Sequence, residues 1–283
     1  MTMQTRFTDL VGCALPLQLA AMGGVGTTEL AAAVVAAGGV GMVPRRAAPV
    51  AGACGVNFLV PFNPSLEEVT ETATTSRVVE FFYGDPRADL VRAVHAGGAL
   101  AGWQVGSADE ATAAVACGCD YVVVQGIEAG GHVRGTQSLD EVLVETRAAL
   151  DVPLVAAGGV ATARRFAEVI RLGADGVRVG TRFVTCPESG AHPEYVRRLL
   201  AATGDETILT EWFNEGWQDA PHRVLRSALE AAQRSGWRAT TAPHRDIDRV
   251  ARDMAMYAGT GVGSVIRAEP AAAVVADLLG DMP

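Results

Sequence analysis

The stretch PLVAAGGVATARRFAEVIRLGADGVRVG, residues 153–180, decides the fold that we predict for this chain of 283 residues. It places two short apolar runs, Pro153–Ala157 and Gly176–Gly180, on either side of a longer amphipathic segment. Short β-branched runs that alternate with amphipathic segments indicate strands joined by crossover helices, and therefore a parallel sheet. Residues 153–180 thus predict one strand–helix–strand unit.

The same unit recurs along the first two thirds of the chain. Further strands are expected at Leu17–Ala21, Gly39–Val43, Gly55–Val60, Val78–Tyr83, Ala99–Val105 and Tyr121–Gln125. Eight strands with seven intervening helical segments by residue 181 match the count of a TIM barrel, and nearly even units favour closure over a doubly wound sheet. The predicted class is α/β, a (β/α)8 TIM barrel with a small appended helical subdomain.

The regular alternation ends after residue 181. We expect the barrel to occupy residues 1–186, a small helical insertion to occupy 187–240, and C-terminal helices that pack on the barrel to occupy 241–283. Helical patterns in these last two parts lie near Glu194–Ala202, Val224–Ser235, Asp246–Tyr257 and Pro270–Leu279.

Composition excludes several classes of function. The formal net charge is −9, which gives no electrostatic reason to expect a nucleic-acid partner. All 23 basic residues are Arg, so Schiff-base chemistry and a P-loop lysine are ruled out. The longest apolar stretch, Leu30–Val43, is too short for a membrane span, and the first ten residues lack the apolar core of a signal peptide.

The five cysteines are scattered and odd in number, which favours reduced thiols in the cytoplasm. Cys117 and Cys119 form a C-x-C pair, but only Asp120 follows as a further ligand type. We therefore expect packing or incidental thiols and no metal site.

Catalytic groups of a barrel lie in the loops after its strands, and three of these loops are unusual. The first runs from Gln125 to His132, the second contains Gly158 and Gly159, and the third is Gly180-Thr181. Paired glycines before a helix present bare backbone N–H groups, which can bind a phosphate without lysine. Gly23-Gly24-Val25-Gly26 does not fit the dinucleotide fingerprint and indicates close backbone approach to a flat ligand.

His132 is the strongest candidate for catalysis. It stands in a glycine-flanked loop at the catalytic face, and its imidazole could act as a base near neutral pH. The remaining four histidines receive no chemical role.

Five of these runs together carry a family resemblance. They are QGIEAGGH (125–132), AAGGV (156–160), GADGVRVGTRF (173–183), GVNFLVPF (55–62) and AAMGG (20–24). In this combination and order, over about residues 15 to 230, the chain resembles the nitronate monooxygenase family.

The resemblance implies a barrel that binds FMN non-covalently, with His132 as the catalytic histidine. The flavin ring would lie near Ala21, Met22 and Gly23, and side chains of Asn57, Gln104 and Gln125 would offer it hydrogen bonds. The ribityl phosphate end would be held by Gly130, Gly158, Gly159, Gly180 and Thr181.

The activity implied is oxidation of alkyl nitronates by O2 to carbonyl compounds and nitrite, with a homodimer as one candidate assembly. His132 would hydrogen-bond the nitro group or remove the α-proton of a neutral nitroalkane.

Two features of the sequence depart from the pattern of the nitronate monooxygenase family, one in the redox tuning of the flavin and one in the activity. Some family members carry a basic residue where Gln104 stands, and such a cation would stabilise reduced anionic flavin, so the redox tuning is an open question. Glu188–Pro193 followed by Tyr195 also resembles flavin-dependent enoyl-acyl-carrier-protein reductases. NADH-dependent enoyl or quinone reduction is therefore an alternative, and a flavin-binding barrel without turnover is a second.

Overall fold

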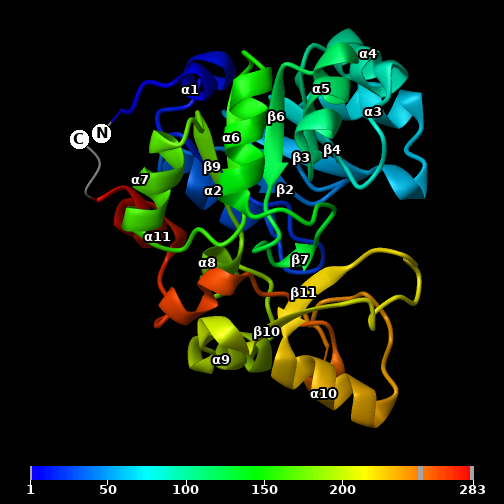
Figure 1. Ribbon diagram of the computed structural model, residues 1–283, viewed down its shortest axis with the longest axis vertical. Coiled ribbons are helices and arrows are strands. Elements are labelled where there is room, and N and C mark those ends of the chain that lie inside the picture. Colours follow the sequence, from blue (N-terminus) through cyan, green and yellow to red (C-terminus); the bar gives the residue numbers. More distant parts are fainter. Residues whose placement is uncertain (1, 248–250, 281–283) are drawn as a thin grey trace.

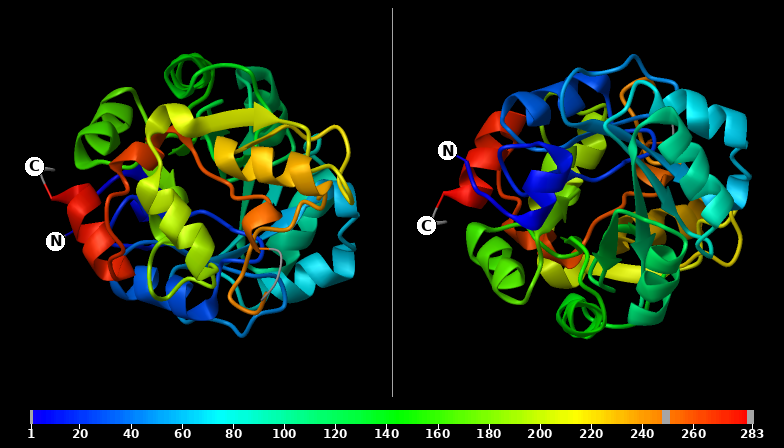
Figure 2. Two further views of the ribbon diagram at one scale, coloured as in Figure 1. Left: turned by 90° about the horizontal axis from the view of Figure 1, so that it is seen from below. Right: turned by 90° about the horizontal axis from the view of Figure 1, so that it is seen from above.

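Eight parallel strands form one closed sheet in the computed structural model, which describes residues 2–247 and 251–280. Their order is β1-β9-β8-β6-β5-β4-β3-β2. The edges meet where Gln18 of β1 bridges Val40, whose N–H donates to the Leu17 carbonyl at 2.8 Å. The predicted (β/α)8 class is confirmed, and Figure 2 shows the ring of strands and helices from both ends. The strands are β1 Leu17–Leu19, β2 Gly41–Val43, β3 Cys54–Leu59, β4 Val78–Phe82, β5 Leu100–Val105, β6 Tyr121–Gln125, β8 Leu154–Ala157 and β9 Gly176–Val179.

Helices surround the barrel, and several begin at a Ser or Thr whose side-chain oxygen accepts the N–H of the third helical residue. They are α1 Arg6–Val11, α2 Thr28–Ala36, α3 Leu66–Ala73, α4 Ala88–Gly97, α5 Ala108–Ala116, α6 Leu139–Ala149, α7 Ala163–Arg171 and α8 Thr181–Val184, with the 3-10 turn η1 Val60–Phe62. Within the described ranges, no helix combines the length and the apolar character needed to cross a bilayer.

The link between β2 and β3 corrects one expectation. Seven intervening helices were predicted, but residues 44–53 form no helix. Two prolines, Pro44 and Pro49, interrupt this ten-residue link, and Arg46 adopts a left-handed φ of 67°. The helix α11 (Ala271–Leu279) contacts α2 and α7, so it occupies the ring position after the last strand, β9, and not the one between β2 and β3 (Figure 1).

The segment after the barrel covers the carboxyl ends of the strands (Figure 1). The helical patterns expected there correspond to α9 (Pro193–Ala201) and α10 (Arg226–Ser235). The segment is not purely helical, however, because β10 (Thr207–Thr210) and β11 (His222–Leu225) pair as an antiparallel hairpin. Strand β11 also pairs with β7 (Gly131–His132), which lies in the loop after β6. The hairpin therefore forms against an exposed strand edge of a barrel loop. The 3-10 turn η2 (Gly204–Glu206) precedes β10.

The C-terminal part contains α11 as predicted, but not a helix over Asp246–Tyr257. Residues 248–250 of that prediction lie outside the described chain, and the 3-10 turn η3 covers only Ala251–Asp253. Tyr257 instead bridges Val224 of β11, and the Leu225 N–H donates to the Met256 carbonyl at 2.9 Å. Pairing with β11 therefore outweighs local helix propensity. A further 3-10 turn, η4, follows at Thr260–Ser264.

Candidate active site

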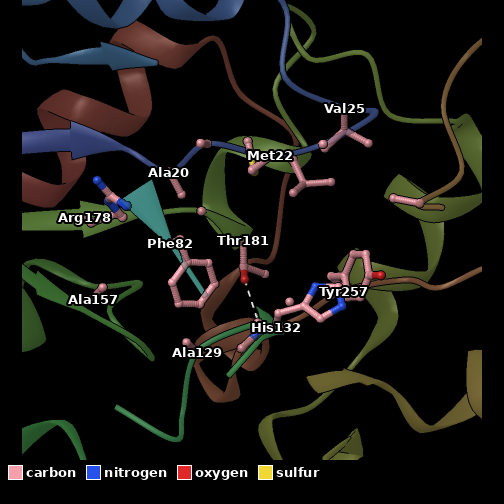
Figure 3. A pocket seen from close by; sticks show the side chains of 18 of the residues that line it. Ala20, Met22, Val25, Phe82, Ala129, His132, Ala157, Arg178, Thr181 and Tyr257 are labelled. Carbon is pink, nitrogen blue, oxygen red and sulfur yellow. Dashed lines mark hydrogen bonds between the residues drawn. The ribbon is translucent and has the colours of Figure 1, made fainter. Parts of the chain in front are cut away.

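A cavity of about 440 Å³ opens at the carboxyl ends of the barrel strands, beneath the β10–β11 hairpin. Its wall combines strand ends with residues of the appended segment and of the chain before α11 (Figure 3). The structure brings all twelve sequence-predicted site residues to this one wall: Ala21, Met22, Gly23, Asn57, Gln104, Gln125, Gly130, His132, Gly158, Gly159, Gly180 and Thr181.

One end of the cavity is a cradle of backbone. Gly158 and Gly159 adopt φ of 124° and 68°, where side chains are strained, so glycine is needed for this turn. Among the described residues, the N–H groups of Gly159, Val160, Gly180 and Thr181 have no hydrogen-bond acceptor. Four such donors from the loops after β8 and β9, which line the same cavity, can bind a phosphate group.

Gly130 lines the same end for a different reason. A Cβ there would lie 2.5 Å from the backbone nitrogen of Gly259. The missing side chain therefore lets the 258–261 segment cross the loop after β6. The Gly259 N–H in turn donates to the Thr181 hydroxyl at 3.1 Å, which fixes that side chain in the cradle.

The other end presents polar side chains without partners. The Asn57 Oδ1 is buried and accepts no hydrogen bond from the residues that the structure describes. A buried amide oxygen left unpaired is costly unless a ligand supplies the donor. Gly23 has open space where its Cβ would point. A flat ligand with hydrogen-bonding edges fits this arrangement.

Gln125 is already engaged with the loop that follows it. Its Nε2 donates to the carbonyl of His132 at 2.9 Å, and its Oε1 accepts the Arg134 N–H at 3.2 Å. Both ends of the amide thus hold the loop that carries His132, and one Nε2 hydrogen remains for a ligand.

His132 sits in β7, where it pairs with His222 of β11. The Trp217 indole stacks on its ring at a centroid distance of 3.8 Å, and the rings of Tyr83 and Tyr257 lie at 6.0 and 5.7 Å. The His132 Nε2 is buried and has no hydrogen-bond partner within residues 2–247 and 251–280. Burial, followed by the neighbouring His222, lowers the pKa of His132 to about 3, so its imidazole is neutral at pH 7.

The aromatic side chains of Trp217, Tyr83 and Phe62 near His132 were not predicted from the sequence as site residues. Trp217 contacts Tyr83 and Phe62 edge to face, at 4.8 and 5.4 Å. These side chains come from the loop after β4, from η1 and from the β10–β11 hairpin, and no short motif joins them. His222, to which sequence reasoning gave no role, lies fully buried behind His132 with its Nδ1 2.9 Å from the Ala220 carbonyl oxygen.

Arg178 is another residue of the cavity wall that the sequence analysis did not identify. It projects from β9 into the barrel and is the single permanently charged side chain among the described residues of the cavity wall. Its guanidinium pairs with Glu80 and donates to Gln104 Oε1 at 2.6 Å. The sequence feature that could have identified Arg178 is a lone Arg inside the apolar run GVRV. A charged side chain on a buried strand needs a partner, so its presence there indicates a specific role.

The residues that suggested an enoyl reductase have structural partners. His192 caps α9, and its Nδ1 accepts the Glu194 N–H at 3.0 Å. Tyr195 is buried, and its hydroxyl donates to the Tyr257 carbonyl. In the described chain, no group of three His, Cys, Asp or Glu side chains is placed to hold a metal ion.

Relatives and solved structures share this architecture. The chain is 31% identical over 256 residues to a (3aS,4S,5R,7aS)-5-hydroxy-7a-methyl-1-oxo-octahydro-1H-indene-4-carboxyl-CoA dehydrogenase of Mycobacterium tuberculosis, covering 84% of this chain and 71% of that protein. It is 31% identical over 269 residues to a nitronate monooxygenase of Pseudomonas aeruginosa, covering 74% and 77%. FabK from Thermotoga maritima superposes with a TM-score of 0.84 at 26% identity, over 99% of this chain and 96% of that one. A nitroalkane oxidase from Streptomyces ansochromogenes does so with a TM-score of 0.79 at 27% identity, over 98% of each.

The family model described as nitronate monooxygenase matches residues 44–281. That range holds the cradle glycines, His132 and Arg178. The chain belongs to the nitronate monooxygenase family of oxidoreductases.

Proposed function

We propose that this protein is an FMN-dependent nitronate monooxygenase that oxidises alkyl nitronates with O2 to carbonyl compounds and nitrite. The observation that carries the proposal is a single cavity with a backbone phosphate cradle at one end and the unpartnered His132 Nε2 in its wall. When bound, FMN would accept electrons from the substrate and pass them to O2.

The residues present fit FMN in three respects. The free N–H groups of Gly159, Val160, Gly180 and Thr181 would receive the phosphate. The unpaired Asn57 Oδ1 would accept a hydrogen bond from the flavin ring, and Gln104 and Gln125 would supply further bonds. Ala21, Met22 and Gly23 would approach the ring, while Gly130, Gly158 and Gly159 shape the end that holds the phosphate.

His132 would bind the nitro group of the substrate. A neutral imidazole donates one hydrogen bond and keeps one lone pair, so it can bind an anionic nitronate without taking up a proton. With a pKa near 3, the same imidazole is a weak base at neutral pH. We therefore expect the preformed nitronate to be a better substrate than the neutral nitroalkane.

The substrate would be small and largely apolar. Phe62, Trp217 and Tyr257 line the cavity near His132. FMN would occupy much of the cavity's volume of about 440 Å³, which leaves little space for a substrate. All five cysteines are free thiols, which supports a location in the cytoplasm.

Anaerobic mixing of the FMN-loaded protein with ethyl nitronate, and separately with NADH, tests the proposal. We expect nitronate to bleach the flavin absorbance and, after O2 is admitted, nitrite to appear. The likeness to FabK makes NADH the necessary second arm. Rapid bleaching by NADH with turnover of an enoyl thioester, and no reaction with nitronate, would overturn the assignment.

A further inference from the structure

Arg178 belongs to a buried polar network that crosses the interior of the barrel. Its Nε and Nη2 donate to Gln18 Oε1 at 3.2 and 2.8 Å, and Nη2 also pairs with Glu80. The Glu80 Oε1 accepts from Gln18 Nε2 and from the Tyr121 hydroxyl, each at 2.7 Å. Residues of β1 and β4, and through Glu80 also β6, thus hold one guanidinium in place.

The network has two sides. Gln18, Glu80 and Tyr121 are fully buried and do not reach the cavity. Arg178 and Gln104 do reach it. The negative end of the ion pair therefore lies in the barrel interior, and the positive end lies at the cavity wall.

Arg178 also fixes the orientation of the Gln104 amide. Its Nη1 donates to Gln104 Oε1 at 2.6 Å, so the amide oxygen is occupied and Nε2 has no acceptor within the described chain. Four of the five guanidinium N–H groups have acceptors, which leaves one on Nη1. The pair thus presents N–H donors of Gln104 Nε2 and Arg178 Nη1 to the ligand.

We propose that Arg178, acting directly and through Gln104, supplies the positive charge that stabilises reduced flavin in this protein, and so replaces a basic residue at position 104. This inference rests on the proposed binding of FMN, but not on the identity of the substrate. The cation comes from β9 instead of β5, and Glu80 sets how much of its charge the flavin experiences.

Substituting Arg178 alone would leave the fully buried Glu80 carboxylate without a cationic partner, and such a change is strongly destabilising. The test therefore uses Glu80→Gln, which keeps one oxygen to accept from Gln18 and Tyr121 but loses the counter-charge and the bond from Arg178. It also uses the pair Glu80→Gln/Arg178→Gln, which removes both charges. The readouts are the midpoint potential of bound FMN and its Kd in the oxidised form.

We expect Glu80→Gln to raise the midpoint potential of bound FMN. The midpoint potential of the double variant should be lower than that of Glu80→Gln and lower than that of the wild type. A tenfold change in the preference for reduced over oxidised flavin corresponds to about 30 mV for a two-electron couple, and we expect at least that between the two variants. Adding Gln104→Lys to the double variant should raise the potential again, because it returns a cation from β5.

The matched control is Arg147→Gln/Asp175→Asn, which removes a partly buried ion pair outside the cavity wall. It should lower Tm without moving the potential. Equal potentials in all folded, FMN-loaded variants would make Arg178 a purely structural residue and overturn the inference. Failure of the wild type to bind FMN would instead reject the proposed function.

Discussion

The imidazole of His132 and the indole of Trp217 lie face to face, with centroids 3.8 Å apart and planes inclined by 21°. His132 follows β6 in the barrel, whereas Trp217 comes from the hairpin 85 positions later in the chain. The stack covers one face of the imidazole and limits its rotation. Substitutions of Trp217 can separate the contribution of this stack to kcat/KM from the contribution of the His132 imidazole itself.

Trp217→Leu should lower kcat/KM for nitronate by about 2- to 10-fold, which corresponds to the ~0.5–1.5 kcal/mol of an aromatic pair. Trp217→Phe keeps a ring over His132 and should recover most of this loss. Steady-state kinetics on both variants, at equal FMN content, make the comparison. Equal losses in Leu and Phe variants would show that indole contacts other than stacking matter.

His132→Asn should reduce turnover by roughly 10²–10³-fold, the range for loss of one preorganised hydrogen-bond donor. FMN content should be retained, because the cradle donors are backbone groups. The losses on ethyl nitronate and on neutral nitroethane should be of the same order, since a base with a pKa near 3 removes few protons at pH 7. A far larger loss on nitroethane would assign His132 the role of base.

The stability of the protein should fall as the pH drops below about 6.5. The pKa values of His132 and His222 are both lowered by burial, so the unfolded chain binds protons that the folded chain excludes. Each group can contribute a slope of up to about 1.4 kcal/mol per pH unit between its unfolded and folded pKa. Urea unfolding of the FMN-free protein from pH 7.5 to 5 measures this slope. It should be shallower in His132→Asn, and an unchanged slope would contradict the assignment.

Gly159→Ala should weaken binding of FMN by about 10-fold or more while leaving the affinity for riboflavin, which lacks the phosphate, nearly unchanged. The new Cβ would face Glu128 Cβ at 3.0 Å and would strain a residue with φ of 68°, which displaces the cradle. Gly98→Ala is the matched control, because Gly98 has φ of 88° but open space around it and lies outside the cavity wall. It should cost about 1–2 kcal/mol of stability and leave both affinities intact. Parallel losses for FMN and riboflavin would place the phosphate elsewhere.

Most of the barrel could be predicted from the sequence because its signals are local. Each strand is a short apolar run, and the helices after them begin at capping residues such as Thr27 and Ser107. The exception, residues 44–53, shows that an even repeat in the sequence can hide a link too rich in proline to form a helix.

The appended segment was harder to predict because its structure depends on distant partners. The β10–β11 hairpin pairs with a two-residue edge at Gly131–His132, and Tyr257 pairs with Val224. For the same reason the glycine cradle could be found from its motifs, whereas Trp217 and Tyr83 could not. Arg178 and Glu80 were visible as charges in apolar strands, but only the closed barrel shows that they meet.

The β10–β11 hairpin offers a route to altered specificity. Residues 207–225 are one continuous stretch that both holds the backbone of His132 and places Trp217 over its ring, whereas the cradle and the Arg178 network come from the barrel strands and their loops. Residues 207–225 could therefore be exchanged as one segment between related enzymes, either in evolution or by protein engineering. Such a chimaera would inherit its redox chemistry from the barrel donor and its substrate range from the hairpin donor.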